Sequence, residues 1–232
     1  MSFPVDADRI TSGGTTTGTF NVSLPTGIQS GNILILVVSV NGTNIGTHPS
    51  EFTQLGSDLQ TFPATYVYWK AATGSEGSTV SVTSGNSKWA SVCWRITGGD
   101  TGITPSISNV NFDATGVADP PSLSPSGGSK EYLWVYVCAC NRQPTMPPSG
   151  TPSGYSNPVG VQSAGSGGVA SKECAFGASK QATAATEDAP SWTTDDASAG
   201  VQAWTVAIHP GEASPEPTYT GLRSGAGLRA VS

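Results

Sequence analysis

Alternation of apolar and polar side chains, with a period of two residues, is the feature that most constrains how this chain can fold. In the segment Thr19-Phe-Asn-Val-Ser-Leu24 every second residue is apolar, and the same pattern recurs in residues 78–83, 89–96 and 201–208. Successive side chains of a β-strand point to opposite faces of a sheet. Each segment is therefore expected to form a strand with one buried face.

Two further segments are apolar at almost every position. Residues 33–40 read Ile-Leu-Ile-Leu-Val-Val-Ser-Val, and residues 132–140 read Tyr-Leu-Trp-Val-Tyr-Val-Cys-Ala-Cys. Short runs of β-branched and aromatic residues bounded by turn residues are typical of strands, and a strand without a polar side is covered on both faces. These segments are expected to be central strands. Weaker strand candidates are residues 52–55, 64–71, 155–161 and 171–178.

The number and spacing of the segments predict an all-β fold. Roughly ten strands favour a two-layer antiparallel β-sandwich, jelly-roll-like rather than a minimal immunoglobulin domain, with Trp94 and Trp204 in its core. Glycine (29 residues) and proline (17 residues) make up about a fifth of the chain, which favours turns over long helices. The one candidate helix, residues 178–189, is polar and contains threonine, so it is a marginal one.

The length of the chain is accounted for by one sandwich domain, residues 1–209, followed by an extended C-terminal arm, residues 210–232. Repeated prolines favour an extended backbone in the arm, which has too few apolar residues to build a core. The triplet Gly-Leu-Arg occurs in it twice and presents apolar anchors and cations to a partner. A floppy terminus is the alternative. The candidate partner-binding residues are Tyr219, Leu222, Arg223, Leu228 and Arg229.

Two long loops interrupt the strand pattern. Residues 98–130 and 143–154 are rich in glycine, proline and serine. Loops of this length in a compact β domain are often functional surfaces or contacts with a partner chain. A solvated excursion is an equally good interpretation of both, so the sequence leaves their role open.

The four cysteines form no metal-binding pattern. Cys93, Cys138, Cys140 and Cys174 include no Cys-x-x-Cys pair and have no histidine nearby, so no metal site is expected. Buried thiols in a chain folded in a reducing cytoplasm are the favoured interpretation. A bridge from Cys93 to Cys138 or to Cys174 remains the alternative.

Charge and hydropathy exclude several classes of partner. The chain carries 10 Lys and Arg against 16 Asp and Glu, a net charge of −6, and has no basic cluster for binding nucleic acid. Its most apolar stretch, residues 33–40, is far shorter than the roughly 20 residues of a membrane-spanning helix. The first nine residues do not read as a secretory signal. A soluble protein without nucleic-acid or membrane partners is expected.

No catalytic motif emerges from the sequence. His48 and His209 each precede a proline and accompany no nucleophile motif, and no phosphate-binding loop is present. The adjacent carboxylates Glu187-Asp188 and Asp195-Asp196 are expected to face solvent, with a surface Ca²⁺ at the second pair as a minor alternative. The sequence therefore predicts a protein that is not an enzyme and carries no cofactor.

Aromatic side chains on strand faces are the best remaining sign of binding. In residues 65–70, Tyr66 and Tyr68 share a face with Lys70, and Tyr155 lies in a later loop. If this face is open, the three tyrosines form an aromatic surface that stacks on sugars or packs against a neighbouring subunit. The competing interpretation places the tyrosines beneath a loop of their own chain.

Several of these segments together resemble β-sandwich proteins encoded among the structural genes of tailed bacteriophages. The resemblance covers about residues 20–209. Its elements are the following segments: Gly31-Asn-Ile-Leu-Ile-Leu-Val-Val-Ser-Val40, Phe52-Thr-Gln-Leu55, Tyr68-Trp-Lys-Ala-Ala-Thr-Gly-Ser-Glu-Gly77, Thr79-Val-Ser-Val-Thr83, Trp94-Arg-Ile-Thr-Gly98 and Ala203-Trp-Thr-Val-Ala-Ile208. These are strand patterns and not catalytic signatures.

The resemblance implies a virion component assembled in the host cytoplasm. The leading hypothesis is a capsid decoration, or cement, protein that binds the outer capsid surface and clamps neighbouring capsomers. Its expected partners are the major capsid protein or another virion protein, and further copies of itself, with a trimer favoured. The alternative is a glycan- or receptor-binding module of a tail tip or fibre that uses Tyr66, Tyr68 and Tyr155. An accessory module of a carbohydrate-active enzyme is a weaker third hypothesis.

Overall fold

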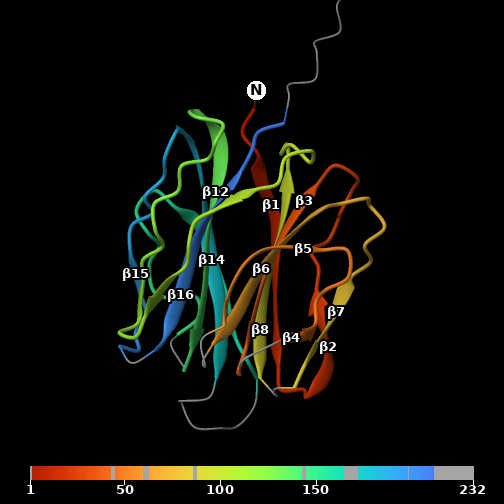
Figure 1. Cartoon of the computed structure of the whole chain (residues 1–232), viewed down its shortest axis with the longest axis vertical. Coiled ribbons are helices and arrows are strands. Elements are labelled where there is room, and N and C mark those ends of the chain that lie inside the picture. The colour runs from red at the N-terminus through yellow and green to blue at the C-terminus, as the bar shows by residue number, and fades with distance from the viewer. Residues whose placement is uncertain are drawn as a thin grey trace, which may run out of the picture.

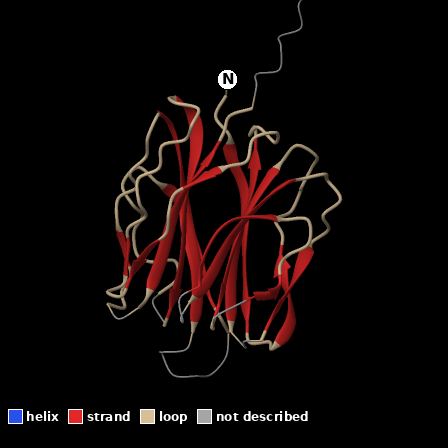
Figure 2. Cartoon of the chain, in the orientation of Figure 1, coloured by secondary structure: helices blue, strands red, loops and turns tan. Residues whose placement is uncertain are grey.

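The structure is a computed structural model that describes residues 2–42, 45–59, 63–85, 88–142, 145–164, 172–197 and 199–211. Within these ranges every regular element is a strand, and no helix is present (Figure 2). The helix predicted over residues 178–189 is therefore wrong. Its first part belongs to strand β14 (Glu173–Ala184), which pairs along its whole length with β12 (Lys130–Asn141). In the described part of the chain no helix is long and apolar enough to cross a membrane.

Two antiparallel sheets form the centre of the molecule. The first has the strand order β1-β8-β3-β6-β5, and the second has the order β10-β16-β12-β14-β13, with β9 also paired to β16. Their bounds, apart from those of β12 and β14, are β1 Val5–Gly14, β3 Ile33–Val40, β5 Thr53–Leu59, β6 Ala64–Ala71, β8 Trp89–Thr97, β9 Ser106–Ile107, β10 Asn111–Asp113, β13 Ser156–Gln162 and β16 Val201–Ile208.

Each central sheet has a further layer on its outer face. Strands β2 (Gly18–Ser23), β7 (Thr79–Ser84) and β4 (Ile45–Thr47) form a small sheet outside the first one. Outside the second, β11 (Val117–Ala118) pairs with β15 (Trp192–Thr193) among loops (Figure 1). The apolar strands β3 and β12 are thus covered on both faces, as expected.

The all-β sandwich predicted from the sequence is confirmed, and its two predicted anchors lie in the core between the sheets. Trp94 and Trp204 are 0% and 1% exposed. Each indole lies opposite a glycine of the other sheet. A Cβ at Gly177 would lie 2.8 Å from Cζ2 of Trp94, and a Cβ at Gly56 would lie 3.6 Å from Nε1 of Trp204. Gly177 therefore makes the room that the Trp94 indole occupies, whereas a Cβ at Gly56 would be in ordinary contact with Trp204.

The jelly-roll connectivity is not confirmed, because each central sheet takes its strands from one half of the chain. The two halves instead share one topology. The order β1-β8-β3-β6-β5 corresponds strand by strand to β9/β10-β16-β12-β14-β13, and the covering pair β2–β7 corresponds to β11–β15. Where the sheets meet, β1 lies against β13 and β5 lies against β9, which are equivalent contacts. The molecule is therefore a structural duplication.

The pairing registers of the strands show which residues of the two halves are equivalent. Lys70 pairs with Leu34 in the first half, and Lys180 pairs with Trp134 in the second. Both edge strands shift register at equivalent positions, between Gln54 and Gly56 in β5 and between Ser156 and Val159 in β13. Each edge strand also follows a Pro-Ser-x-aromatic turn, in which the aromatic N–H donates to the proline carbonyl. These turns are residues 49–52 and 152–155.

The buried indoles give a direct test of the core. Replacing Trp94 by alanine is expected to lower the free energy of unfolding by about 3–5 kcal/mol, because it leaves a cavity that the sheets cannot close. Urea denaturation measures this loss. The matched control is Val5→Ala at a side chain that is 46% exposed, where a change within about 0.5 kcal/mol is expected. A loss below about 1 kcal/mol for Trp94→Ala would contradict this packing.

Candidate functional site

The aromatic surface predicted from Tyr66, Tyr68 and Tyr155 is wrong, because all three side chains are buried. They are 3%, 0% and 6% exposed. Strand β4 covers Tyr66, whose hydroxyl accepts a hydrogen bond of 3.2 Å from the Ile45 N–H. Tyr155 packs in the core between the second sheet and its cover. The tyrosines therefore support the interior and do not form a binding face.

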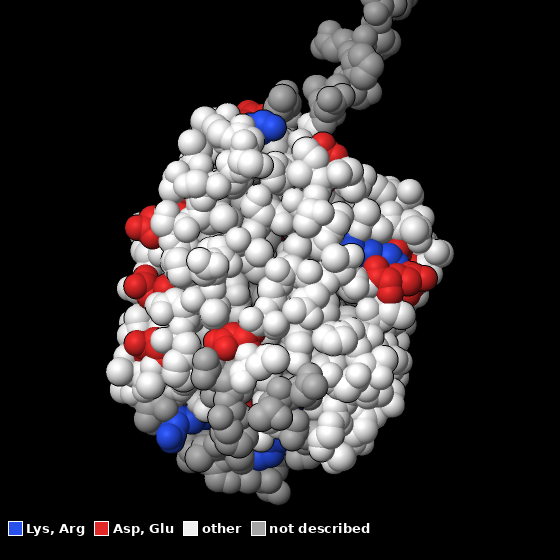
Figure 3. Space-filling model, viewed as in Figure 1, with Lys and Arg blue, Asp and Glu red and all other residues white. Residues whose placement is uncertain are grey.

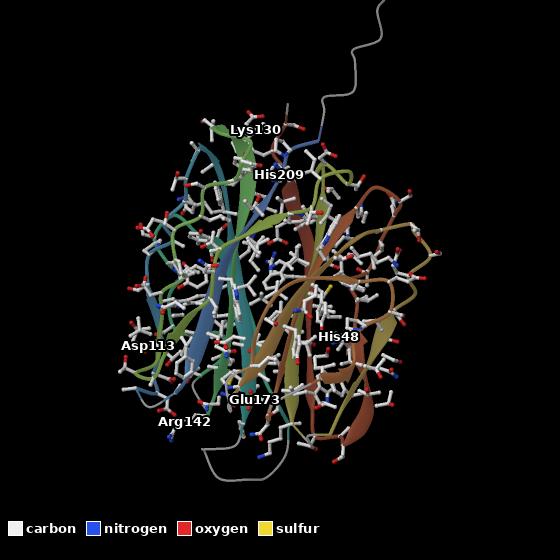
Figure 4. The ribbon with its side chains drawn as sticks, in the orientation of Figure 1. His48, Asp113, Lys130, Arg142, Glu173 and His209 are labelled. Carbon is white, nitrogen blue, oxygen red and sulfur yellow. The ribbon has the colours of Figure 1, made fainter. Side chains whose placement is uncertain are left out.

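Each histidine contacts a hydroxyl, and among the described residues no carboxylate is hydrogen-bonded to either imidazole. Nδ1 of His48 lies 2.7 Å from the hydroxyl of Tyr68, and burial raises the pKa of that hydroxyl, so Tyr68 stays neutral. His209 lies near one end of the sandwich (Figure 4), with Nε2 3.2 Å from Oγ of Ser106. Burial lowers the pKa of His209. Its Nδ1 is buried without a hydrogen-bond partner among the described residues.

A polar hollow lies beside strand β6, between the turn of residues 49–52 and the turn of residues 73–76. It has a volume of about 330 Å³, and we call it the Lys70 hollow. Its lining mixes charged groups, hydroxyls and three apolar side chains. The lining residues are Leu24, Ser50, Glu51, Phe52, Lys70, Ser75, Glu76, Thr79, Val80 and Ser81.

An ion-pair cluster occupies the hollow. The Lys70 side chain is 7% exposed, and its Nζ lies 2.5 Å from Oε2 of Glu51 and 3.1 Å from Oε1 of Glu76. Burial by itself would raise the pKa of Glu76, but the N–H of Thr73 and the Lys70 ammonium outweigh it and lower the pKa to about 2. The two carboxylates likewise raise the pKa of Lys70 against the effect of burial. Lys70 and Glu76 are therefore charged at neutral pH.

The duplication repeats this ion pair with one difference. In the second half, Nζ of Lys180 lies 2.8 Å from Oε1 of Glu187. There Tyr155 covers the pair: its hydroxyl donates to Glu187, and the Lys180 ammonium lies 5.5 Å from the centroid of its ring. Phe52 takes the position of Tyr155 in the first half and has no hydroxyl. Glu187 is thus buried in an ion pair, and the prediction that it faces solvent is wrong.

Glu51 has a backbone conformation that is unfavourable for its side chain. Its φ is 63°, whereas the equivalent residue of the second half is Gly154 with a φ of 79°. A residue with a Cβ loses about 1–2 kcal/mol in this left-handed region. The Glu51 side chain is 74% exposed, and an exposed ion pair returns only about 0.2–1 kcal/mol. Stability alone does not explain Glu51, which makes it the candidate functional residue of the hollow.

A second ionisable group lies buried between the two halves. Glu173 of β14 is 0% exposed, and it accepts a hydrogen bond of 2.8 Å from Oγ of Ser39 on β3. Burial raises its pKa to about 8, against the opposing effects of Ser39, Asn41 and Lys88. Glu173 lies toward the end of the sandwich opposite His209 (Figure 4). The carboxyl therefore couples the association of the halves to pH.

The remaining predicted residues fall into three groups. All four cysteines are buried free thiols, as favoured from the sequence. Asp195 is exposed and accepts hydrogen bonds from Thr145, and the described ranges contain no cluster of three or more side chains suited to a metal ion. The arm residues Tyr219, Leu222, Arg223, Leu228 and Arg229 lie outside the described residues.

Comparison with known proteins gives no relative from which a function is transferred. No protein-family model, curated protein or solved structure matches the chain. The site itself is the basis for inferring function.

The buried carboxyl makes stability depend on pH. The ordinary pKa of Glu173 is 4.5 and its folded value is about 8, so the folded chain holds this proton more tightly between those values. The contribution of this group to stability is therefore greatest below about pH 4.5 and is lost as the pH rises toward 8. Glu173→Gln is expected to be more stable than the natural chain at pH 9 and similar to it at pH 4.5. Urea denaturation of both chains between pH 4.5 and pH 9 measures this difference. If the free energy of unfolding changes with pH equally in both chains, the assignment is contradicted.

The strain at Glu51 is testable by exchanging the two equivalent residues. Glu51→Gly is expected to leave the free energy of unfolding unchanged or higher, although it removes an ion pair, because glycine adopts this φ freely. Gly154→Ala is expected to lower the free energy by about 1–2 kcal/mol, because it introduces the same strain in the second half. Thermal and urea unfolding measure both effects. A loss above about 1 kcal/mol for Glu51→Gly would show that the side chain is structural.

Proposed function

We propose that this chain is a non-enzymatic structural protein of a bacteriophage particle that attaches to a neighbouring virion protein, as a capsid decoration protein does. One observation supports this most: in the part of the chain that the structure describes, most of the large apolar and aromatic side chains are buried inside the molecule. Both central sheets are covered on both faces, and five of the six tryptophans are buried. The face shown in Figure 3 is mostly uncharged, with scattered carboxylates and few cations. Such a surface suits broad, weak contacts.

The proposed mechanism is adhesive. Each contact with the capsid buries less than roughly 1,000 Å², and many contacts act together because copies are fixed on a repeating lattice. Burial of surface across the boundary between capsomers raises the barrier to their separation under the pressure of packaged DNA. A trimeric arrangement on the major capsid protein fits this mechanism, because three copies multiply a weak contact.

The segment that follows the sandwich is the proposed attachment element. The loop of residues 98–130 supplies strands β9 and β10, which extend the second sheet, and β11, which covers it, so much of this loop is used inside the fold. At the end of the sandwich, Pro210 pairs with Gly99, and the Gly211 N–H donates a hydrogen bond of 2.9 Å to the Gly98 carbonyl. Residues 212–232 therefore start from a fixed point on the domain.

The alternative of a glycan- or receptor-binding module no longer has the surface first proposed for it. The tyrosines that were to stack on sugars are buried beneath the covering strands and loops. Capsid attachment remains the function that the surface and the resemblance support best.

Truncation separates folding from attachment. A chain that ends at Gly211 is expected to keep the circular dichroism spectrum and unfolding midpoint of the full chain. Its affinity for purified capsids that lack decoration is expected to fall at least tenfold, because residues 212–232 supply the contact. Sedimentation of labelled protein with capsids measures both affinities.

A substituted chain serves as a control for the loss of length. The full chain with Leu222→Ser and Leu228→Ser keeps the arm but removes its apolar anchors, and it is expected to bind as weakly as the truncated chain. Equal capsid affinity of the truncated and full chains would remove the arm from the mechanism. Failure of the full chain to bind capsids would contradict the proposed function itself.

A further inference from the structure

We infer that the Lys70 hollow is a binding site for a neutral, hydroxyl-rich ligand of the size of a pyranose sugar. The inference does not depend on attachment to a capsid, because it comes from the hollow and its lining alone. The volume of about 330 Å³ falls within the range of about 300–1,000 Å³ that is typical of small-molecule sites.

The charges of the hollow select against an ionic ligand. The exposed carboxylate of Glu51 repels anions, and the described residues around it contain no group of three or more side chains suited to a metal cation. The Glu76 carboxylate is already engaged by Lys70 and by the N–H groups of Thr73 and Gly74. A neutral ligand that both donates and accepts hydrogen bonds fits such a mixed lining. Sugar hydroxyls do both.

Hydroxyl side chains complete this match. Ser50, Thr79 and Ser81 line the hollow with groups that donate and accept hydrogen bonds. The apolar lining residues Leu24 and Val80 are only 4% and 8% exposed, so the surface open to a ligand is mainly polar. A pyranose presents hydroxyls at its rim, which fit such a lining.

Comparison of the two halves isolates the residue that is specific to the hollow. In the second half the hydroxyl and ring of Tyr155 contact the equivalent ion pair. In the first half the aromatic residue is Phe52, and an extra carboxylate comes from Glu51 in its left-handed conformation. The side chains of Lys70 and Glu76 are 7% and 2% exposed, whereas that of Glu51 is 74% exposed. The duplication has thus kept the ion pair in both halves and added an exposed carboxylate in one.

The neighbouring surface has room for a longer ligand. A second hollow of about 380 Å³ shares Leu24 and Glu76 with the first and continues along Thr26, Gly27 and Ser78. A disaccharide placed with one ring in the Lys70 hollow therefore finds surface for its second ring. The site is expected to bind a disaccharide more tightly than its single sugar.

The test is a titration of the full chain followed by amide chemical shifts. The probes are the methyl glycosides of glucose, galactose and N-acetylglucosamine, then the disaccharides maltose, lactose and chitobiose. The expected result is saturable binding of at least one probe, with shifts at the amides of Glu51, Lys70 and Thr79. Glu51→Gly is expected to weaken that binding at least tenfold while the variant stays folded.

A matched control relieves the same kind of strain elsewhere. Asn157 has a φ of 56° in the second half, so Asn157→Gly changes the backbone in the same way without touching the hollow. It is expected to bind the probe as the natural chain does. Absence of binding by all six probes, shifts at other surfaces only, or equal affinity of the Glu51→Gly variant would overturn the inference. Saturable shifts with calcium chloride alone would instead assign a cation site and would also overturn it.

Discussion

Every layer of this molecule follows from the need to bury both faces of strands β3 and β12. All eight side chains of β3 are buried, as are the nine residues from Tyr132 to Cys140 in β12. One face of each strand packs in the core between the two sheets, and the other face requires a separate cover. The covering sheet β2–β7–β4 and the pair β11–β15 with its loops meet that requirement. Burial on this scale is the dominant favourable term in folding.

The duplication meets this requirement twice with one arrangement of strands. A lysine on the fourth strand of each sheet, buried at Lys70 and partly buried at Lys180, would be unfavourable without a partner, and each half supplies a glutamate from the following loop. The halves differ in what lies beside the ion pair. Tyr155 contacts the second pair, whereas the exposed Glu51 contacts the first one beside a hollow.

Much of the fold was predictable from the sequence, because alternation and two-sided apolar runs report directly on burial. Segment 64–71, the two-sided strands and the buried tryptophans are found as expected. The helix over residues 178–189 failed because pairing with β12 overrides weak local propensity. Tyr66 and Tyr68 were misplaced because alternation separates two faces without showing what covers them. The duplication is hard to predict because equivalent residues differ in kind, as Tyr68 and Ala178 do. The similarity of the two halves is visible in the sequence only at the turns Pro49-Ser-Glu-Phe52 and Pro152-Ser-Gly-Tyr155.

Native-state hydrogen exchange tests closure of both outer faces most directly. The backbone N–H groups of Leu36 in β3 and Tyr136 in β12 occupy equivalent positions in the two halves. If each sheet is sealed by its cover, both amides exchange only through global unfolding, with the same free energy of opening as urea denaturation gives. Exchange of either amide at a much lower free energy than the other would show that one cover opens independently, and it would contradict a fold sealed on both sides.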